Sequence, residues 1–205
     1  MMKKIHYLSG LTISVFVVFH LVNHFGAFNG AAAHIALMNT FRELYRNPIV
    51  EPALILLFLT QTISGINLFL KIPASQQGWM LLKKWSGLYL VFFLLIHLSA
   101  VFFGRVVLKL DTNFYFGVAG LNAFPVCLFF IPYYGLAVGS FFTHVAAIHH
   151  SKMRAQLLGL SPQTQSKIIM TMGWCLAILL LLVLTNFGNG FTVPAAYAVL
   201  TQWPF

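Results

Sequence analysis

The sequence predicts an all-α integral membrane protein, a five-helix bundle with its N-terminus inside and its C-terminus outside. Of the 205 residues, 60% are hydrophobic and 7% are charged, whereas soluble domains carry about 25% charged residues. Five apolar runs each approach the ~20 residues that cross a bilayer core. Basic residues gather in alternate connections between these runs, and this bias indicates the orientation.

The five transmembrane helices are expected at residues 6–27, 51–71, 85–106, 124–148 and 167–187, within one membrane domain 1–205. Pro52 lies near the start of the second run and Pro125 opens the fourth. Both positions suit a helix start, because proline fits the first turn of a helix. Ser161-Pro162 ends the loop before the fifth. The first run is too long for a signal-peptide core and contains His20, so it is read as a helix that is retained.

Two segments outside the spans are expected at the outer face. Residues 29–47 place apolar side chains at helical spacing, which predicts a short amphipathic helix on the outer interface. The tail 188–205 is rich in glycine and then apolar, and it is expected to fold over the outer helix ends.

The net charge of +9 is explained by the positive-inside rule rather than by nucleic-acid binding. All three acidic residues fall on the outer face, so the inner face is purely basic. That face serves topogenesis alone, or it is a docking surface for an acidic soluble partner. The expected location is the cell's inner (cytoplasmic) membrane, in contact with lipid. The inner face is expected to carry Lys3, Lys4, Lys71, Lys83, Lys84, Lys152, Arg154 and Lys167, and the outer face Arg42, Arg46, Arg105 and Lys109.

Three histidines, His20, His97 and His144, lie within the spans and away from their ends, where such residues are costly and usually functional. The first and third spans share a pattern, since Ser-Gly-Leu is followed by a histidine ten residues after the glycine. At 1.5 Å per residue, His20 and His97 then lie at equal depth on parallel helices. Such a pair can ligate one iron from opposite sides. Hydrogen bonding between helices is the alternative use of these two side chains.

Haem b suits this pair better than a bare metal ion. A structural zinc site wants four protein ligands, whereas a porphyrin supplies four nitrogens and needs only axial side chains. No CxxCH motif for covalent haem is present. Phenylalanines on the same two spans would surround an apolar macrocycle, although an aromatic stripe more often reflects plain packing: Phe16, Phe19, Phe92, Phe93 and Phe102.

A second, inner layer is expected at His144 of the fourth span, with Gln61 of the second span opposite. Because glutamine is a poor haem ligand, this layer is empty or altered, or it holds a haem on His144 with a weak or missing sixth ligand. One haem is therefore expected and the second is left open. His24, His34 and Glu51 are candidates for proton exchange with a quinone near the outer face, or they are simply polar groups at the wet interface. The remaining histidines are expected at the inner edge: His6, His149 and His150.

The order and spacing of these residues resemble a known family, the five-helix, single-polypeptide cytochrome b subunit of succinate:quinone oxidoreductases. This is the dihaem type of some succinate dehydrogenases and fumarate reductases. The likeness covers residues 3–187 and is carried by His6, His20-Leu21-Val22-Asn23, Gln61 to Gly65, Trp79-Met80, Ser86-Gly87, His97, His144, Ser161-Pro162 and Gln165.

The resemblance implies that His20 and His97 ligate the distal haem and that His144 ligates the proximal one. The family has a histidine where this chain has Gln61, which leaves the proximal haem open. Flavoprotein and iron–sulfur subunits would dock on the cytoplasmic face, and electrons would pass through haem to a quinone. No dicarboxylate active site and no catalytic residue are expected in this chain, which has neither GxGxxG nor a cluster-binding cysteine set. The alternatives are a haem-binding subunit of another respiratory or photosynthetic complex, and a haem-free structural or transport protein.

Overall fold

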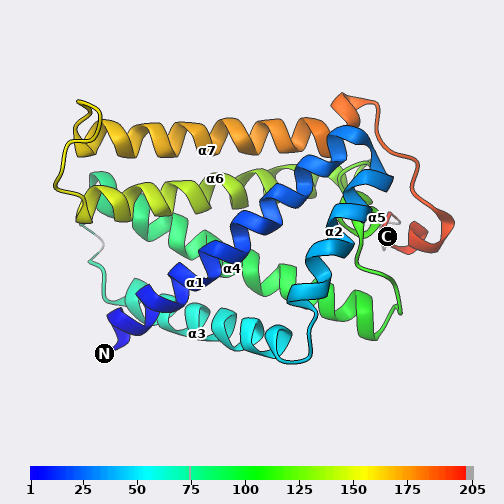
Figure 1. The fold of residues 1–205 in the computed structure, drawn as a ribbon, viewed down its shortest axis with the longest axis horizontal. Helices are drawn as coiled ribbons and strands as arrows, with labels where there is room; N and C mark the ends of the chain where they lie inside the picture. The colour runs from blue at the N-terminus through cyan, green and yellow to red at the C-terminus, as the bar shows by residue number, and fades with distance from the viewer. Residues whose placement is uncertain (74, 202–205) are drawn as a thin grey trace.

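Five long helices form the body of the protein (Figure 1), in a computed structural model that describes residues 1–73 and 75–201. Each is long and apolar enough to cross a membrane. In the described residues the only β feature is an isolated bridge between Leu157 and Leu160. The prediction of an all-α, multi-pass membrane protein is confirmed. The five helices are α1 (Met2–Phe25), α3 (Val50–Leu70), α4 (Gly78–Val106), α6 (Cys127–Lys152) and α7 (Pro162–Leu184).

The helix boundaries differ from the expected ones mainly at their starts. Helix α4 begins at Gly78 and α7 at Pro162, each earlier than the apolar run suggests. At α7 the Ser161 hydroxyl accepts a hydrogen bond of 3.2 Å from the backbone N–H of Thr164. This N-cap, followed by proline in the first turn, starts the helix before its apolar part. Helix α6 begins at Cys127, two residues after Pro125.

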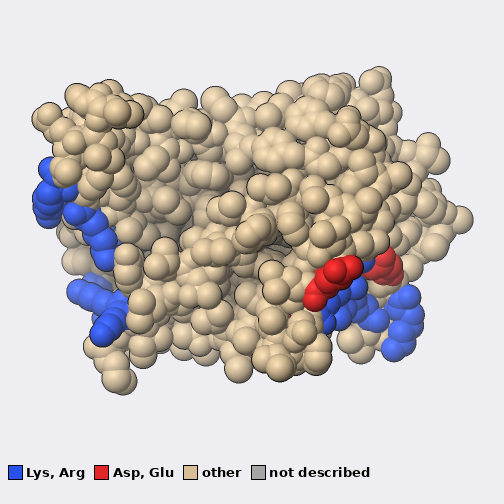
Figure 2. Space-filling model, in the orientation of Figure 1, with Lys and Arg blue, Asp and Glu red and all other residues tan. Residues whose placement is uncertain are grey.

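Charged residues lie at the two ends of the bundle and leave an uncharged band between them, as Figure 2 shows for one face. We call the end with Lys3, Lys4, Lys71, Lys83, Lys84, Lys152, Arg154 and Lys167 the lysine end, and the end with Arg42, Arg46, Arg105 and Lys109 the arginine end. Glu43, Glu51 and Asp111 lie at the arginine end. Which end faces the cell interior stays a prediction.

Short helices cover the arginine end. Helix α2 (Ala31–Tyr45) follows the 3₁₀ turn η1 (Gly26–Asn29), connects α1 to α3 and buries His34 and Met38. The expected helix in 29–47 is therefore present. Helix α5 (Phe114–Val118) and the 3₁₀ turns η2 (Asn186–Gly188) and η3 (Ala195–Leu200) complete this cover. Tyr197 of η3 donates a 3.0 Å hydrogen bond to the carbonyl of Asp111. Residues 202–205 of the tail lie outside the described residues.

Helices α6 and α7 form the closest-packed pair in the bundle. Small residues let their backbones approach, as is typical of membrane helix interfaces. A Cβ added at Gly139 would come within 2.6 Å of the Trp174 ring, and one at Gly173 would overlap Phe142. The Trp174 ring N–H donates to the Thr143 hydroxyl over 3.2 Å. This close packing fixes the position of α6 against α7.

Two further pairs complete the bundle, α1 packed on α3 and α4 packed on α6. In Figure 1, α1 crosses the front of the bundle diagonally, from α3 near the lysine end towards α7 at the arginine end. The crossing keeps most of α1 away from α6, so the two pairs enclose a space along the bundle.

Candidate functional site

A cavity of about 1290 Å³ runs along the bundle and is lined by α1, α3, α4 and α6. It is larger than most ligand pockets, which measure about 300–1,000 Å³. Its walls extend from Lys3 and Lys152 at the lysine end to Arg42 and Arg105 at the arginine end. All the candidate residues named from the sequence line this cavity: His20, His24, His34, Glu51, Gln61, His97 and His144.

His20 of α1 and His97 of α4 meet in this cavity. Their ring centroids are 6.1 Å apart and their ring planes are inclined by 69°. Metal–imidazole bonds measure about 2.0 Å, so two imidazoles on opposite sides of one metal have centroids about 6 Å apart. In the described residues neither side chain has a hydrogen bond to the protein, and no three His, Cys, Asp or Glu side chains are grouped to hold a metal ion. The ring separation is therefore compatible with two axial ligands of one metal.

Each of the two imidazoles stacks on a phenylalanine of its own helix, four residues earlier. The Phe16 and His20 rings are 5.8 Å apart and inclined by 14°, and the Phe93 and His97 rings are 5.1 Å apart and inclined by 16°. Residues four apart share one face of a helix, which explains the contact. The two phenylalanines hold the imidazole planes on matching faces of α1 and α4.

Three other phenylalanines expected around the macrocycle do not line the cavity. Phe19, Phe92 and Phe102 are 48%, 45% and 45% exposed and point away from the bundle interior. Their positions on the helices are the reason, since Phe19 is turned by about 100° from His20, and Phe92 and Phe102, each five residues from His97, are turned by about 140° from it. Phe19 packs on Phe41 of α2 instead.

His24 and His34 extend the imidazole cluster towards the arginine end. The Asn23 amide nitrogen and His24 Nδ1 each lie 3.3 Å from His34 Nε2. His24 also lies 4.9 Å from His20, ring to ring. Burial, with His20 and Arg42 nearby, lowers the pKa of His34 to about 4. His34 is therefore neutral at pH 7, and its buried Nδ1 has no hydrogen-bond partner.

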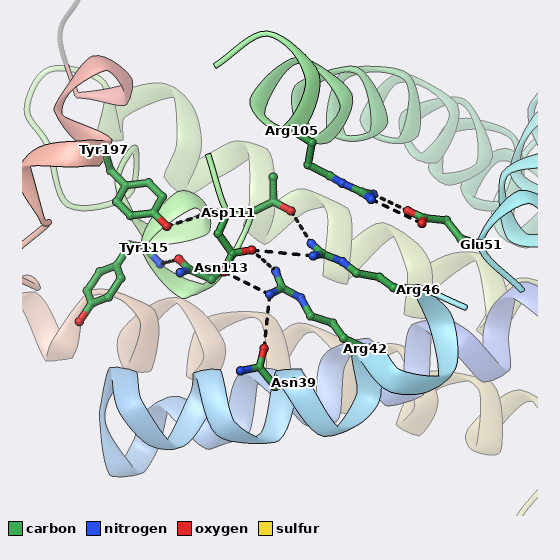
Figure 3. Close-up of polar contacts among 10 residues, drawn as sticks. Asn39, Arg42, Arg46, Glu51, Arg105, Asp111, Asn113, Tyr115 and Tyr197 are labelled. Carbon is green, nitrogen blue, oxygen red and sulfur yellow. Dashed lines mark hydrogen bonds and ion pairs between the residues drawn. The ribbon is translucent and has the colours of Figure 1, made fainter. Parts of the chain in front are cut away.

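The third quinone candidate, Glu51, is not in contact with this histidine pair. Its carboxylate pairs with Arg105, which joins the start of α3 to the end of α4 (Figure 3). Nearby, Arg42 pairs with Asp111 at 2.9 Å, and Arg46 donates to the Thr112 hydroxyl at 2.9 Å. Three guanidinium groups and two carboxylates thus surround the arginine end of the cavity, with an excess of positive charge.

The lysine end of the cavity repeats one arrangement twice. Ser9 of α1 donates a 2.6 Å hydrogen bond to the side-chain oxygen of Gln61 on α3. Ser86 of α4, at the matching position of the repeated motif, lies 3.2 Å from Nδ1 of His144 on α6. The expectation that Gln61 and His144 are counterparts at one depth rests on helix lengths, and this pairing of serines supports it.

His6 was expected at the membrane edge, but it lies inside the bundle beside Gln61. Its Nδ1 is 2.8 Å from the Ser64 hydroxyl and its Nε2 is 3.3 Å from the Gln61 amide nitrogen. The sequence of α3 gave no sign of this partner, because the contact depends on how α1 crosses α3. His149 bonds Gln165 at 2.9 Å, and His150 stacks on Trp79, at the lysine end where both were expected.

Comparison with protein-family models, with curated protein sequences and with solved structures finds no match for this chain.

Proposed function

We propose that this chain is a haem b-binding membrane subunit that carries electrons between soluble partners and a membrane quinone. The observation that carries the proposal is the His20–His97 pair, with ring centroids 6.1 Å apart inside a large cavity. That separation fits two axial ligands on opposite sides of one iron. When bound, haem supplies reversible one-electron transfer, which side chains alone do not provide.

The protein's own part is to fix and shield the two ligands. Stacking on Phe16 and Phe93 restricts rotation of the imidazoles, so little order has to be gained when the iron binds. The cavity walls are largely apolar, as a porphyrin face requires. At the arginine end, Arg42 pairs with Asp111, and its buried Nε has no hydrogen-bond partner, which leaves one donor that suits a carboxylate of a haem.

We place the soluble partners at the lysine end. That end carries no acidic residue in the described chain, and such a surface attracts an acidic partner over a distance comparable to the Debye length. From the sequence likeness described above, we propose that the chain is the anchor of a succinate:quinone oxidoreductase-like complex in the cytoplasmic membrane. Its partners would then be a flavoprotein and an iron–sulfur subunit.

The quinone is proposed to react near His24 and His34. His24 Nδ1 lies 3.3 Å from His34 Nε2, and the His24 ring also lies 4.9 Å from the His20 ring. A quinone that takes up electrons also takes up protons, and linked imidazoles can pass protons by changing tautomer. Glu51 is not in contact with them, so its proposed role shifts to pairing with Arg105.

The test is spectroscopic and uses the full-length chain purified in detergent. We expect a b-type reduced-minus-oxidised spectrum and a low-spin signal from bis-imidazole ligation. His97→Ala and His20→Ala should each remove the low-spin signal. His150→Ala, on α6 but outside the cavity, is the control and should retain it. Absence of b-type absorbance in the wild-type chain, or a low-spin signal that survives His97→Ala, contradicts the proposal.

The partners need a separate experiment, because another respiratory or photosynthetic complex would give the same spectrum. The chain should be isolated with its native partners under mild detergent. Reduction of the haem by succinate in that complex supports the anchor of a succinate:quinone oxidoreductase. Co-isolation of a different oxidoreductase, with no reduction by succinate, assigns the subunit to another complex.

A further inference from the structure

The connection between α6 and α7 contains a tight two-residue turn at the lysine end (Figure 1). Leu157 and Leu160 exchange two backbone hydrogen bonds, of 2.9 and 3.3 Å, around Leu158 and Gly159. Both central residues have a positive φ, +52° at Leu158 and +74° at Gly159. Two positive φ values in succession are characteristic of the type I′ turn of a β-hairpin.

Leucine is an unusual residue at the first central position of this turn. Asparagine or aspartate followed by glycine is preferred there, because these short polar side chains tolerate a positive φ. A leucine in this conformation is sterically disfavoured. No packing inside the chain compensates, since Leu158 is 99% exposed. Strained residues of this kind cluster at functional sites, which directs attention to the exposed side chain.

A buried glutamine holds the turn in place. Gln165 of α7 is 8% exposed, and its amide donates to the carbonyl of Leu160 over 2.8 Å and to that of Ala155 over 3.2 Å. Its side-chain oxygen lies 2.9 Å from Nε2 of His149 on α6. Because these contacts fix the turn before any partner arrives, little conformational entropy has to be lost on binding.

The turn lies beyond the apolar part of the bundle. The start of α7, residues 162–167, carries proline, polar residues and Lys167 before the apolar run begins. These residues extend about 9 Å at 1.5 Å per residue, whereas the headgroup region is about 5–7 Å deep on each side of a bilayer. Leu158 precedes them, so its side chain faces water, unlike the exposed leucines along the spans.

Basic side chains flank the turn. Lys152 and Arg154 precede it, Lys167 follows it, and all three are exposed. In the described part of the chain no acidic residue lies at this end, and Figure 2 shows none there on the face that it presents. A matching surface is therefore apolar where it receives the leucine and acidic around it.

We propose that the turn 157–160 is the docking point of the soluble partner, and that Leu158 inserts into an apolar pocket with an acidic rim on that partner. This inference rests on the proposed function, which places a soluble oxidoreductase subunit at the lysine end. In such an interface the buried apolar anchor supplies much of the affinity, and the surrounding charges guide the encounter.

Leu158→Asn separates docking from folding. It gives the turn its preferred Asn-Gly sequence, so the melting temperature of the purified chain should stay equal or rise. In the complex isolated with its native partners in mild detergent, the flavin content reports the soluble partner. We expect at least fivefold less flavin per membrane chain than in the wild type. Ile49→Ala truncates a side chain of equal size that is 79% exposed at the arginine end, and this control should retain the flavin.

A labelling experiment distinguishes a protein partner from lipid. Leu158→Cys and Ile49→Cys are each made in a chain that carries Cys127→Ala and Cys175→Ala, and each is placed in nanodiscs of phosphatidylcholine and phosphatidylglycerol. A membrane-impermeant maleimide should label both variants in the chain alone. In the native complex, labelling of Leu158→Cys should slow at least tenfold and that of Ile49→Cys should not change. Protection of Leu158→Cys in the chain alone would place the turn in lipid and overturn the inference.

The outcomes separate this inference from the proposed function. Flavin retained at the wild-type level by Leu158→Asn, with a haem spectrum in the same sample, would overturn the inference and leave the proposed function intact. A wild-type chain that holds haem but retains no soluble partner would also overturn the inference. Absence of both haem and partner would overturn the inference and the proposed function together.

Discussion

Ser9 of α1 contacts Gln61 of α3 in the same way as Ser86 of α4 contacts His144 of α6. In each case a serine hydroxyl lies within hydrogen-bond distance of a polar side chain on the partner helix. The repeat extends further, because a phenylalanine lies seven residues and a histidine eleven residues after each serine. The α1–α3 and α4–α6 pairs are therefore built alike, and they differ where α3 has glutamine and α6 has histidine. That one difference makes the two layers of the cavity chemically unequal.

Ser9→Ala should destabilise the protein by about 1–2 kcal/mol, because the partly buried Gln61 oxygen loses its 2.6 Å donor. Ser14→Ala is the matched control, since the Ser14 hydroxyl bonds only a carbonyl of its own helix. Thermal unfolding in detergent measures both. Equal stabilities of the two variants would show that the contact between α1 and α3 adds nothing.

Much of the fold was predictable from the sequence, because a membrane span has to be a long apolar helix whatever its neighbours are. The depth of His20 and His97 followed from helix rise alone, and the two rings do meet. The choice of surrounding phenylalanines was wrong for Phe19, Phe92 and Phe102. Depth along a helix can be counted from its end, whereas the face towards the cavity depends on helix rotation. The i, i+4 relation of Phe16 to His20 was the available signal.

Contacts made by helix crossing could not be predicted. His6 lies beside Gln61 because α1 crosses α3 near the lysine end. Glu51 pairs with Arg105 rather than with His24, because the start of α3 lies next to the end of α4. Both results need the crossing geometry, which single-chain periodicity does not contain. The short helices over the arginine end are also set by packing on the bundle rather than by their own length.

Packing of α6 on α7 should be intolerant of a single methyl group. Gly173→Ala places a Cβ where Phe142 stands, so we expect a loss of about 1–3 kcal/mol from overpacking. Gly117→Ala in α5 is the control, because nothing lies within 4 Å of the added atom. The measurement is the midpoint of thermal unfolding. A Gly173→Ala variant as stable as Gly117→Ala would mean that α6 and α7 can move apart enough to accept the added methyl group without loss of stability.

The two ion pairs at the arginine end should differ in strength. Arg42 is 11% exposed, so Asp111→Asn leaves a largely buried guanidinium without its counter-charge. Asp111 itself is 46% exposed, so solvent screens the pair, and we expect a loss of about 1–2 kcal/mol, mainly because the buried guanidinium is left unpaired. Glu51→Gln removes the partner of Arg105, a side chain 33% exposed, and should cost under about 1 kcal/mol. Chemical denaturation of the two variants ranks them, and the reverse order would refute this account.

His24→Leu should separate quinone reaction from haem binding. The substitution removes the imidazole that links His34 to His20 but leaves both proposed axial ligands in place. We expect an unchanged low-spin signal and at least a tenfold slower oxidation of reduced haem by a soluble quinone analogue. His150→Ala is again the control, with wild-type rates. A His24→Leu variant that oxidises at the wild-type rate would move the quinone site elsewhere.

Stability should fall on acidification because of His34. Burial lowers its pKa from 6.5 to about 4 in the folded chain, so between these values the unfolded chain binds more protons than the folded one. The resulting stability is fully present above pH 6.5 and is lost as the pH falls towards 4. His34→Gln cannot be protonated, and the difference in melting temperature between wild type and variant should therefore narrow from pH 7 to pH 5. His150→Ala, which removes a histidine at the opposite end, controls for general acid sensitivity and should melt in parallel with the wild type. A constant difference between wild type and His34→Gln over that range would show that His34 binds its proton equally in both states.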